Sequence, residues 1–258
     1  MSLLEVTNLT KNFGGLLAVQ KLDFKIDEGE IVGLIGPNGA GKTTIFNLIC
    51  GIHRPTNGKV VFNGNDITNL SADKVAAYGL CRTFQQLSVF GDFSVLDSEL
   101  IGFHLHAKNS YFGSIFGLPS ILKQNVVLKQ EAMEILKFME LDKYSNELVK
   151  NLPYGSQKAL GIAIAMAAKP RLLLLDEPVA GMNSAEKLAM MEHIRRIRAR
   201  GCSILLVEHA MKVVMGLCER IIVVNFGEKI AEGIPDEIQR NESVIEAYLG
   251  VKQDVDVS

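Results

Sequence analysis

The chain has 258 residues, of which 48% are hydrophobic, and carries a formal net charge of -2 at pH 7. This length allows one large domain, or one domain with an added lobe. The near-neutral charge excludes a general attraction to nucleic acid or anionic lipid, so we expect no nucleic-acid partner, although a local basic patch stays open. No run of about 18 apolar residues occurs, so we expect no transmembrane helix. The first 15 residues also lack the pattern of a signal peptide.

The four cysteines, Cys50, Cys81, Cys202 and Cys218, lie far apart in the sequence and form no CxxC pair. This spacing disfavours a zinc site or a disulfide framework. We therefore expect small buried thiols, as in proteins of a reducing compartment.

The amino-terminal part of the chain predicts short strands punctuated by glycines, over residues 3–9, 19–26, 30–36 and 58–64. Residues 42–51 predict a helix that ends at Gly51. From about Phe90 to Pro153 strand signals are nearly absent. Residues 131–141 have helical spacing, which puts four apolar side chains on one face: Ala132, Ile135, Leu136 and Met139.

Short apolar runs return at residues 171–175, 202–209 and 219–225, separated by helical stretches. Buried parallel strands typically have this pattern. The sequence therefore predicts an α/β core that is interrupted by a mostly helical lobe. Residues 107–120 contain glycines and aromatic residues, and they form either a partner-facing excursion or an ordinary loop.

Residues 36–44, GPNGAGKTT, match the pattern G-x-x-x-x-G-K-[ST] between a predicted strand and a predicted helix. Glycines let the backbone N–H groups of such a loop wrap phosphate oxygens, and the helix N-terminus adds positive partial charge. The lysine would reach the β- and γ-phosphates, and the first threonine would supply a hydroxyl to Mg²⁺. The predicted nucleotide-binding residues are Gly36, Pro37, Asn38, Gly39, Ala40, Gly41, Lys42, Thr43 and Thr44.

Two acids, Asp176 and Glu177, end the apolar run LLLLDE. An aspartate at such a strand end helps to hold Mg²⁺ in P-loop proteins. A carboxylate beside it can orient or deprotonate an attacking water. The alternative is a pair of solvated charges without a function. The predicted phosphate-binding loop in the same chain disfavours that alternative.

His209 ends another predicted strand, CSILLVEH. A lone histidine there is usually structural. However, the carboxyl edge of an α/β sheet is where ligands collect, so His209 could contact the γ-phosphate.

This ordered set of motifs resembles the ATP-binding cassette (ABC) family, the nucleotide-binding subunits of ABC transporters, over nearly the whole chain. The resemblance implies an ATPase with residues 36–44 as its Walker A loop and with Asp176 and the catalytic Glu177 as its Walker B motif. It also implies that Gln85, in RTFQ, senses Mg²⁺ and the attacking water, and that His209 is the switch histidine. Phe13, in KNFGG, would stack on adenine; a packed phenylalanine at a strand end is the alternative.

The fold implied by the resemblance is an α/β P-loop ABC-ATPase core with an antiparallel β part and an inserted α-helical subdomain. Residues 1–258 would form a single ATP-binding domain. Its core would comprise about 1–88 and 166–258, and its helical subdomain about 89–165. Residues 179–183, VAGMN, would form the loop through which family members communicate across a dimer.

LPYGSQ, residues 152–157, aligns with the family signature, which is usually LSGGQ. The resemblance implies that Tyr154, Gly155 and Ser156 open a helix whose N-terminus points at the γ-phosphate bound by a second subunit. A helix N-terminus has free N–H donors and positive partial charge, which suits this use. Pro153 replaces the usual serine and removes both a hydroxyl and an N–H, which weakens any role for that side chain in binding phosphate. A plain helix start is the alternative.

A finer resemblance is to the ATPases of branched-chain amino acid importers, carried by NFGGLLAV, RTFQ, AGMN, EHAMKVVM and GEKIAEGIPDEIQRNESVIEAYLG. Importers of urea and short amides and some lipopolysaccharide-export ATPases share much of this pattern and stay as alternatives. One departure is Ala210, because an acid commonly follows the switch histidine. The implied partners are transmembrane permease subunits, a second ATP-binding subunit (identical or paralogous) and, indirectly, a substrate-binding protein. The implied location is peripheral, at the cytoplasmic face of the cell membrane.

The segment from Gln85 to about Phe116 is the expected docking surface for a transmembrane subunit. It carries too many apolar residues for an ordinary solvated loop, and exposed apolar patches mark partners. These residues are Leu87, Val89, Phe90, Phe93, Ile101, Phe103, Phe112 and Phe116.

Three other functions are less well supported. The first is an ABC ATPase that acts as a nucleotide-dependent clamp on nucleic acid or on the ribosome. Such proteins usually have two cassettes or a long coiled-coil insertion, whereas this chain has one cassette and no sustained heptad pattern. Glu177 and His209 argue against a non-hydrolytic nucleotide-binding module. The sequence has no N-K-x-D motif, which disfavours a GTPase.

Overall fold

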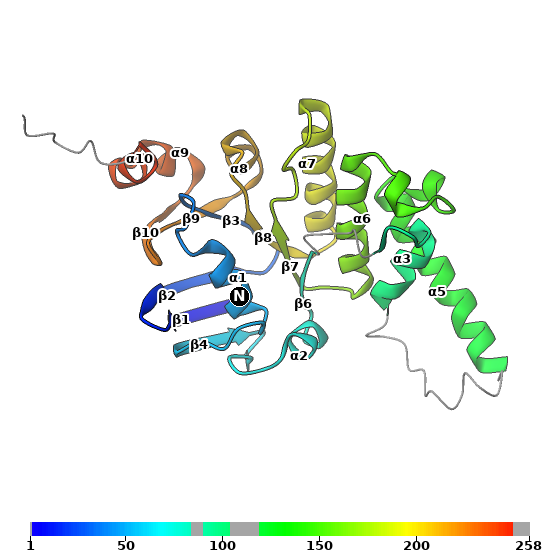
Figure 1. The fold of residues 1–258 in the computed structure, drawn as a ribbon, viewed down its shortest axis with the longest axis horizontal. Coiled ribbons are helices and arrows are strands. Elements are labelled where there is room, and N and C mark those ends of the chain that lie inside the picture. Colours follow the sequence, from blue (N-terminus) through cyan, green and yellow to red (C-terminus); the bar gives the residue numbers. More distant parts are fainter. Residues whose placement is uncertain (1, 84–89, 104–118, 250–258) are drawn as a thin grey trace, which may run out of the picture. The chain divides into compact units, whose positions relative to one another are not determined.

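The computed structural model describes residues 2–83, 90–103 and 119–249, without the side chains of residues 119–125. Figure 1 shows the course of the chain. The chain divides into two compact units. The first comprises residues 1–75 and 203–258, and the second comprises residues 76–202. The predicted boundaries of a core and a helical subdomain stay a prediction.

An antiparallel sheet forms the amino-terminal part of the first unit. Its strands run in the order β2 (Leu16–Asp27), β1 (Ser2–Phe13), β4 (Asn57–Phe62) and β5 (Asn65–Asp66). β1 and β2 are longer than predicted, because the turn of Gly14 and Gly15 lets pairing continue to the last residue of β1. Both glycines have positive φ, 54° and 106°.

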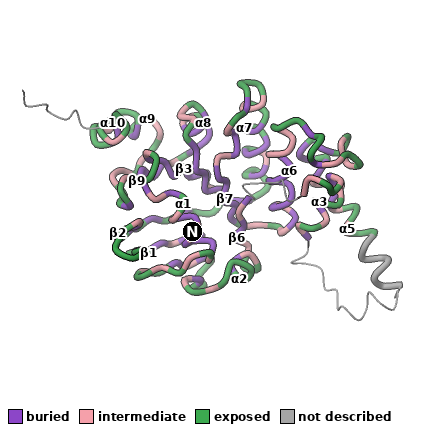
Figure 2. The backbone as a smooth tube through the Cα atoms, viewed as in Figure 1, coloured by how far each residue is buried: buried purple, intermediate pink, exposed green. Residues whose placement is uncertain are grey.

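Parallel strands form the second part of this unit. β3 (Ile31–Ile35) lies between β8 (Ser203–Val207) and β9 (Arg220–Asn225), and β10 (Glu228–Gly233) pairs antiparallel with β9. Every residue of β3 and β8 is buried, and Figure 2 shows β3 buried along its length. This confirms that the continuous apolar runs are buried parallel strands.

Among the described residues of this unit, four helices accompany the strands: α1 (Lys42–Ile49), α8 (Met211–Leu217), α9 (Pro235–Arg240) and α10 (Glu242–Leu249). α1 ends as predicted, because Gly51 takes the left-handed conformation (φ 72°) that commonly terminates helices. α2 (Ala72–Ala77) lies across the boundary between the units in the sequence.

Arg220 ties together strands of the first unit that are distant in sequence. Its guanidinium donates two bonds of 2.8 Å to the carboxylate of Glu30, which precedes β3, and one of 2.8 Å to the carbonyl of Lys25 in β2. It also pairs with Glu232 in β10. Two parallel bonds from one guanidinium to one carboxylate hold geometry better than a single contact does.

The second unit combines a strand pair with a group of helices. β6 (Leu80–Arg82) pairs parallel with β7 (Leu172–Asp176). The helices are α3 (Val95–Gly102), α5 (Pro119–Phe138), α6 (Tyr154–Ala167) and α7 (Ser184–Ala199). Short 3-10 turns at Asp142–Tyr144 and Val149–Asn151 connect α5 to α6.

α3 packs closely against α6 and α5, as Figure 1 shows. A Cβ at Gly102 would lie 2.4 Å from the carbonyl oxygen of Ile164, so only glycine allows this approach. Phe103, Ala132 and Ala167 form a buried cluster there. The predicted apolar face of residues 131–141 is confirmed: Ala132, Leu136 and Met139 are buried, and Ile135 packs against the cluster.

All four cysteines are free and buried, as expected from the sequence. Burial raises the pKa of Cys81 to about 11 and the pKa values of Cys202 and Cys218 to about 12, which disfavours the reactive thiolate. Within the described part of the chain, no helix is long and apolar enough to cross a bilayer.

Glu99 in α3 is a carboxyl group in an apolar environment. The residue is 0% exposed, and neither carboxyl oxygen has a hydrogen-bond partner within the described part of the chain. Burial raises its pKa to about 8 from an ordinary 4.5, because the charged form loses its hydration. The folded protein therefore binds this proton more tightly than the unfolded chain does. Its contribution to stability is full below pH 4.5 and is lost as pH rises through about 8.

Glu99→Gln should remove this pH dependence. The variant should differ little from the wild type near pH 4.5 and exceed its free energy of unfolding by about 4 kcal/mol near pH 8, since a tenfold difference in proton affinity between the folded and unfolded chain corresponds to about 1.4 kcal/mol. Urea unfolding across this pH range measures the difference, with exposed Glu134→Gln as the control. A gain that is equal at both pH values would show that Glu99 is already ionised in the folded protein.

Candidate active site

The loop of residues 36–44 joins β3 to α1 and carries the predicted phosphate cradle. A Cβ at Gly36 (φ 157°) would lie 2.0 Å from the carbonyl oxygen of Val224. A Cβ at Gly41 (φ 100°) would lie 2.6 Å from the carbonyl oxygen of Ala18. These neighbours are backbone atoms that cannot rotate away, so both positions require glycine. The loop therefore packs onto its supporting strands through the glycines that the phosphate motif contains.

The cradle lysine lies over its own loop. Lys42 is buried, and its Nζ donates to the carbonyl oxygens of Gly36 (2.7 Å) and Pro37 (2.8 Å). The ammonium is thus held where the loop curves, close to the backbone that would surround a phosphate.

The first turn of α1 presents backbone donors. Gly41 is its N-cap and supplies no side-chain cap, so the first amides of the helix lack that acceptor. Thr43 is exposed and Thr44 is half-buried, while Asn38 and Gly39 in the loop are exposed. Such a helix start suits a phosphate, which accepts from the amides and meets the positive end of the dipole.

Phe13 ends β1 with 41% of its surface exposed, so it is not packed in the core. Its ring meets His53 edge-on, with 5.5 Å between ring centroids, and the Nζ of Lys11 lies 4.8 Å from the ring centroid. The exposed part of the ring remains accessible to a flat ligand.

His209 is exposed just after β8, in a turn organised by its neighbour. The carboxylate of Glu208, 3% exposed, accepts from the backbone N–H of His209 (3.0 Å) and of Ala210 (3.2 Å). The acid that caps this turn therefore precedes the histidine. The sequence pattern predicted an acid at the position of Ala210, whereas the acid that the turn uses is Glu208.

Asp176 lies at the end of β7 and is bound by an arginine. Its Oδ2 accepts from a terminal nitrogen of Arg82, at the end of β6, at 2.6 Å. Both side chains are largely buried. Arg82 could not be predicted from the sequence, because 94 residues separate the pair and only the parallel pairing of β6 with β7 brings them together.

Glu177 follows β7 in a left-handed conformation, with φ 48°. This region costs a residue with a Cβ roughly 1–2 kcal/mol, so such residues cluster at functional sites.

The signature stretch begins α6 as predicted. Pro153 is its N-cap, and the first helical bond runs from the N–H of Gln157 to the carbonyl of Pro153, at 3.0 Å. The proline nitrogen is therefore outside the helical bonding pattern. The side chain of Gln157 donates to the carbonyl of Leu152 at 3.0 Å and fixes the chain before the helix.

Two close contacts join the signature to residues 179–183 and to α7. A Cβ at Gly181 would lie 3.0 Å from the ring of Tyr154, and one at Gly155 would lie 3.1 Å from Oε1 of Glu186. Glu186 and Asn183 form a capping box at the start of α7, with bonds of 2.9 and 3.0 Å. The signature and the loop predicted to contact a second subunit thus touch each other within this chain.

Some of the remaining predicted residues are not among the residues that the structure describes. Gln85 is one of these, as are Leu87, Val89, Phe112 and Phe116 of the expected docking surface. Phe93 and Ile101 are exposed, as a docking surface requires. Phe103 is 1% exposed and belongs to the core, so its inclusion in that surface was wrong.

Each unit contains part of the predicted site. The first carries the cradle, Phe13 and His209, and the second carries Asp176, Glu177 and the signature turn.

Two family models match the chain. The model described as ABC transporter matches residues 19–180. The model described as branched-chain amino acid ATP-binding cassette transporter matches residues 228–253.

Curated relatives match over nearly their whole length. The high-affinity branched-chain amino acid transport ATP-binding protein LivG of Escherichia coli is 40% identical over 249 residues, covering 96% of this chain and 98% of LivG. The corresponding protein BraF of Pseudomonas aeruginosa is 38% identical over the same coverage. A solved ATP-binding cassette of an ABC transporter in its ADP conformation superimposes with a TM-score of 0.86 at 30% identity, covering 97% of this chain and 99% of that one.

The turn that carries His209 depends on Glu208. Glu208→Ala should lower the free energy of unfolding by about 1–2 kcal/mol, because two amides at the start of α8 lose their acceptor. Glu208→Gln keeps an accepting oxygen and should cost less. Urea unfolding of both variants makes the comparison, and equal losses would show that the capping bonds do not hold this turn.

Proposed function

Since this chain belongs to the ABC transporter family, whose ATP-binding cassettes are ATPases coupled to transport, we propose that it powers the uptake of branched-chain amino acids. The observation that carries the proposal is the glycine-built loop of residues 36–44 at the start of α1. The match of residues 228–253 and the names of the relatives support the amino acid substrate. Uptake of urea or short amides is the second candidate, because its ATPases resemble the same motifs.

ATP would bind with its phosphates in the cradle. The amides of the α1 first turn and the ammonium of Lys42 would hold the phosphate oxygens, and the exposed ring of Phe13 would stack on adenine. Stacking reads any flat base, so the nucleotide base would be selected only weakly.

Mg²⁺ fits the oxygen donors that the chain offers. Mg²⁺ prefers one or two carboxylates together with water and substrate phosphates, so it needs no dedicated cluster of acids. We propose that the hydroxyl of Thr43, the carboxylate of Asp176 and the amide of Gln85 hold it. When bound, the ion neutralises charge on the phosphate oxygens. Arg82 would keep the Asp176 carboxylate oriented.

Glu177 would orient or deprotonate the water that attacks the γ-phosphate, giving ADP and inorganic phosphate. The left-handed backbone at this residue supports a placed carboxylate rather than a solvated one. The imidazole of His209, on the turn capped by Glu208, would contact the γ-phosphate.

A second ATP-binding subunit, identical or paralogous, would complete the site. We propose that Tyr154, Gly155 and Ser156 present the amides of α6 to the γ-phosphate bound by that subunit. The absence of a side-chain cap at Pro153 supports this use. Permease subunits would dock on the segment from Gln85 to about Phe116 and place the protein at the cytoplasmic face of the membrane, with a substrate-binding protein as an indirect partner.

Glu177→Gln should retain ATP binding and lose hydrolysis by orders of magnitude, because the isosteric amide cannot take a proton. A phosphate-release assay beside a nucleotide titration measures both, and Lys42→Ala, which should lose tight ATP binding, is the control. Hydrolysis near the wild-type rate would remove Glu177 from the mechanism.

The same variant tests the substrate in cells. A strain that depends on this subunit should lose uptake of labelled leucine when it carries Glu177→Gln. Loss of urea or amide uptake, with leucine uptake intact, would favour the second candidate.

Gly155→Asp should abolish ATP-driven dimer formation in a Glu177→Gln background, because its carboxylate would face both the phosphate and Glu186. ATP binding to the monomer should survive, since the cradle is untouched. Pro153→Ser is the matched control and should change ATPase activity by less than about tenfold, or 1.4 kcal/mol. Light scattering reports the dimer. Normal dimer formation by Gly155→Asp would reduce the signature to a plain helix start.

A further inference from the structure

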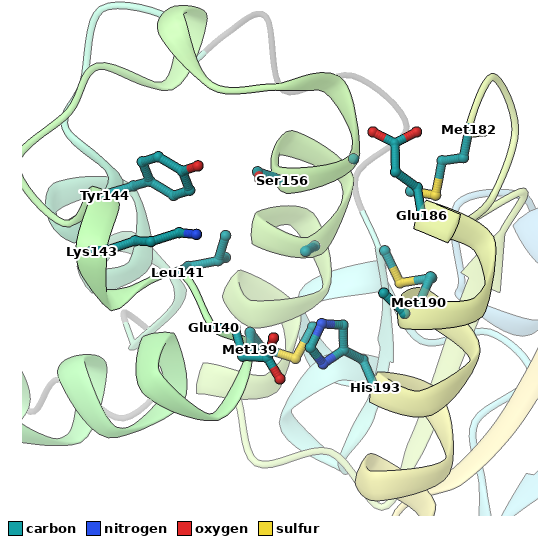
Figure 3. A pocket seen from close by; sticks show the side chains of 13 residues that line it. Met139, Glu140, Leu141, Lys143, Tyr144, Ser156, Met182, Glu186, Met190 and His193 are labelled. Carbon is teal, nitrogen blue, oxygen red and sulfur yellow. The ribbon is translucent and has the colours of Figure 1, made fainter. Parts of the chain in front are cut away.

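The second unit contains a pocket of about 200 Å³ that the proposed ATPase mechanism does not use. Figure 3 shows it between the first turns of α6, the first half of α7 and the turn that follows α5. An engineered cavity of about 150 Å³ is large enough to hold benzene. This pocket therefore has room for a small organic molecule.

One part of the pocket is apolar and adaptable. Met139, Leu141, Met182 and Met190 line it, and all four are buried. Methionine side chains are flexible and polarizable, so they fit aliphatic groups of varied shape.

The polar part of the pocket carries both signs of charge. Lys143 and Tyr144 follow α5, and Figure 3 shows their ammonium and hydroxyl pointing toward α6. Among the described residues, Lys143 has no salt bridge; its Nζ lies 5.0 Å from the ring centroid of Tyr144. Glu140 supplies a carboxylate, of which Oε1 is bound to Arg196 at 3.1 Å.

His193 adds a buried nitrogen that has no partner among the described residues. It is 8% exposed, and its Nδ1 forms no hydrogen bond to any of them. Burial lowers the pKa of His193 and so favours the neutral ring, whose unprotonated nitrogen accepts a hydrogen bond. Leaving a buried polar nitrogen unpaired is unfavourable, and a ligand with an N–H donor would remove that penalty.

We propose that this pocket binds a small zwitterionic amino acid with an aliphatic side chain. The side chain lies among the methionines, the carboxylate meets Lys143 and Tyr144, and the ammonium meets Glu140 and Nδ1 of His193. That this ligand is also the transported class rests on the proposed function, whereas the site itself rests on the pocket.

The site would let the cytoplasmic product reach the ATPase cycle. Gly155 and Ser156 also line the pocket, so a bound amino acid contacts the first turn of α6. The same turn is proposed to face the nucleotide of the second subunit. The pocket is then a sensor of delivered product.

Calorimetric titration of the nucleotide-free protein with L-leucine tests the proposal. We expect one site with a Kd on the order of a millimolar. Two analogues separate the charges: 4-methylpentanoate lacks the ammonium and 3-methylbutylamine lacks the carboxylate. Each should bind at least about tenfold more weakly, the effect of losing one charge-assisted contact.

Ala189→Phe and Ala185→Phe form a matched pair. Both alanines are exposed on α7, and only Ala189 lines the pocket. Leucine binding should be lost in Ala189→Phe and retained in Ala185→Phe. Lys143→Met should weaken leucine binding about tenfold and abolish the preference for leucine over 3-methylbutylamine, whereas Lys150→Met, at an exposed lysine outside the pocket, should do neither.

Three results would contradict the proposed amino acid site. No heat from leucine up to a few tens of millimolar, binding that survives Ala189→Phe, or binding of either analogue as tight as that of leucine would overturn the proposal. Normal ATPase activity in the same preparation would show that the proposed function stands without the sensor. Loss of ATPase activity in Glu177→Gln, conversely, leaves leucine binding untouched.

Discussion

The packing of the first unit depends on three places where two backbone segments lie so close together that only glycine fits between them. The phosphate loop touches β9 at Gly36 and β2 at Gly41, and the turn after β9 touches β2 at Gly227, where a Cβ would lie 2.7 Å from the carbonyl of Ala18. The N–H of Gly227 also donates to the carbonyl of Ala40 at 3.0 Å. These contacts fix the direction in which α1 starts, and therefore where its amides point.

The second unit has a comparable junction built from side chains. Tyr154 lies against Gly181, and Gly155 lies against Glu186, whose other oxygen is bound in the capping box with Asn183. The starts of α6 and α7 consequently pack directly against each other. The proposed amino acid pocket lies beside this junction and is lined by residues of both helices.

Local sequence patterns predicted the helices and strands well. At residues 30–51, for example, an apolar run marks the strand, a glycine-rich stretch marks the loop, and Gly51 marks the end of the helix. Continuous apolar runs identified the buried strands, and helical spacing identified the face of α5 that packs inward. The length of β1 was underestimated, because pairing with β2 extends beyond its apolar stretch.

Tertiary pairing was the part that sequence could not supply. The bond between Arg82 and Asp176 exists only because β6 and β7 are parallel neighbours, and the strained φ of Glu177 has no signature in composition. Glu208 did leave a signal, an acid adjacent to His209, but on the side opposite to the one expected. The position of Pro153 before the first helical N–H explains how α6 can begin at a proline.

Lys42 has a consequence for ligand discrimination. Its ammonium is already solvated by two carbonyl oxygens of its own loop, at 2.7 and 2.8 Å. An anion that binds this lysine must replace the hydrogen bonds to those two carbonyl oxygens. The binding free energy is therefore the difference between the new ion pair and the bonds that it replaces, and not the full strength of the ion pair. A singly charged anion would gain less from that exchange than a polyphosphate, which brings more negative charge to the same ammonium. We therefore expect the folded-back lysine to favour highly charged ligands over monovalent anions.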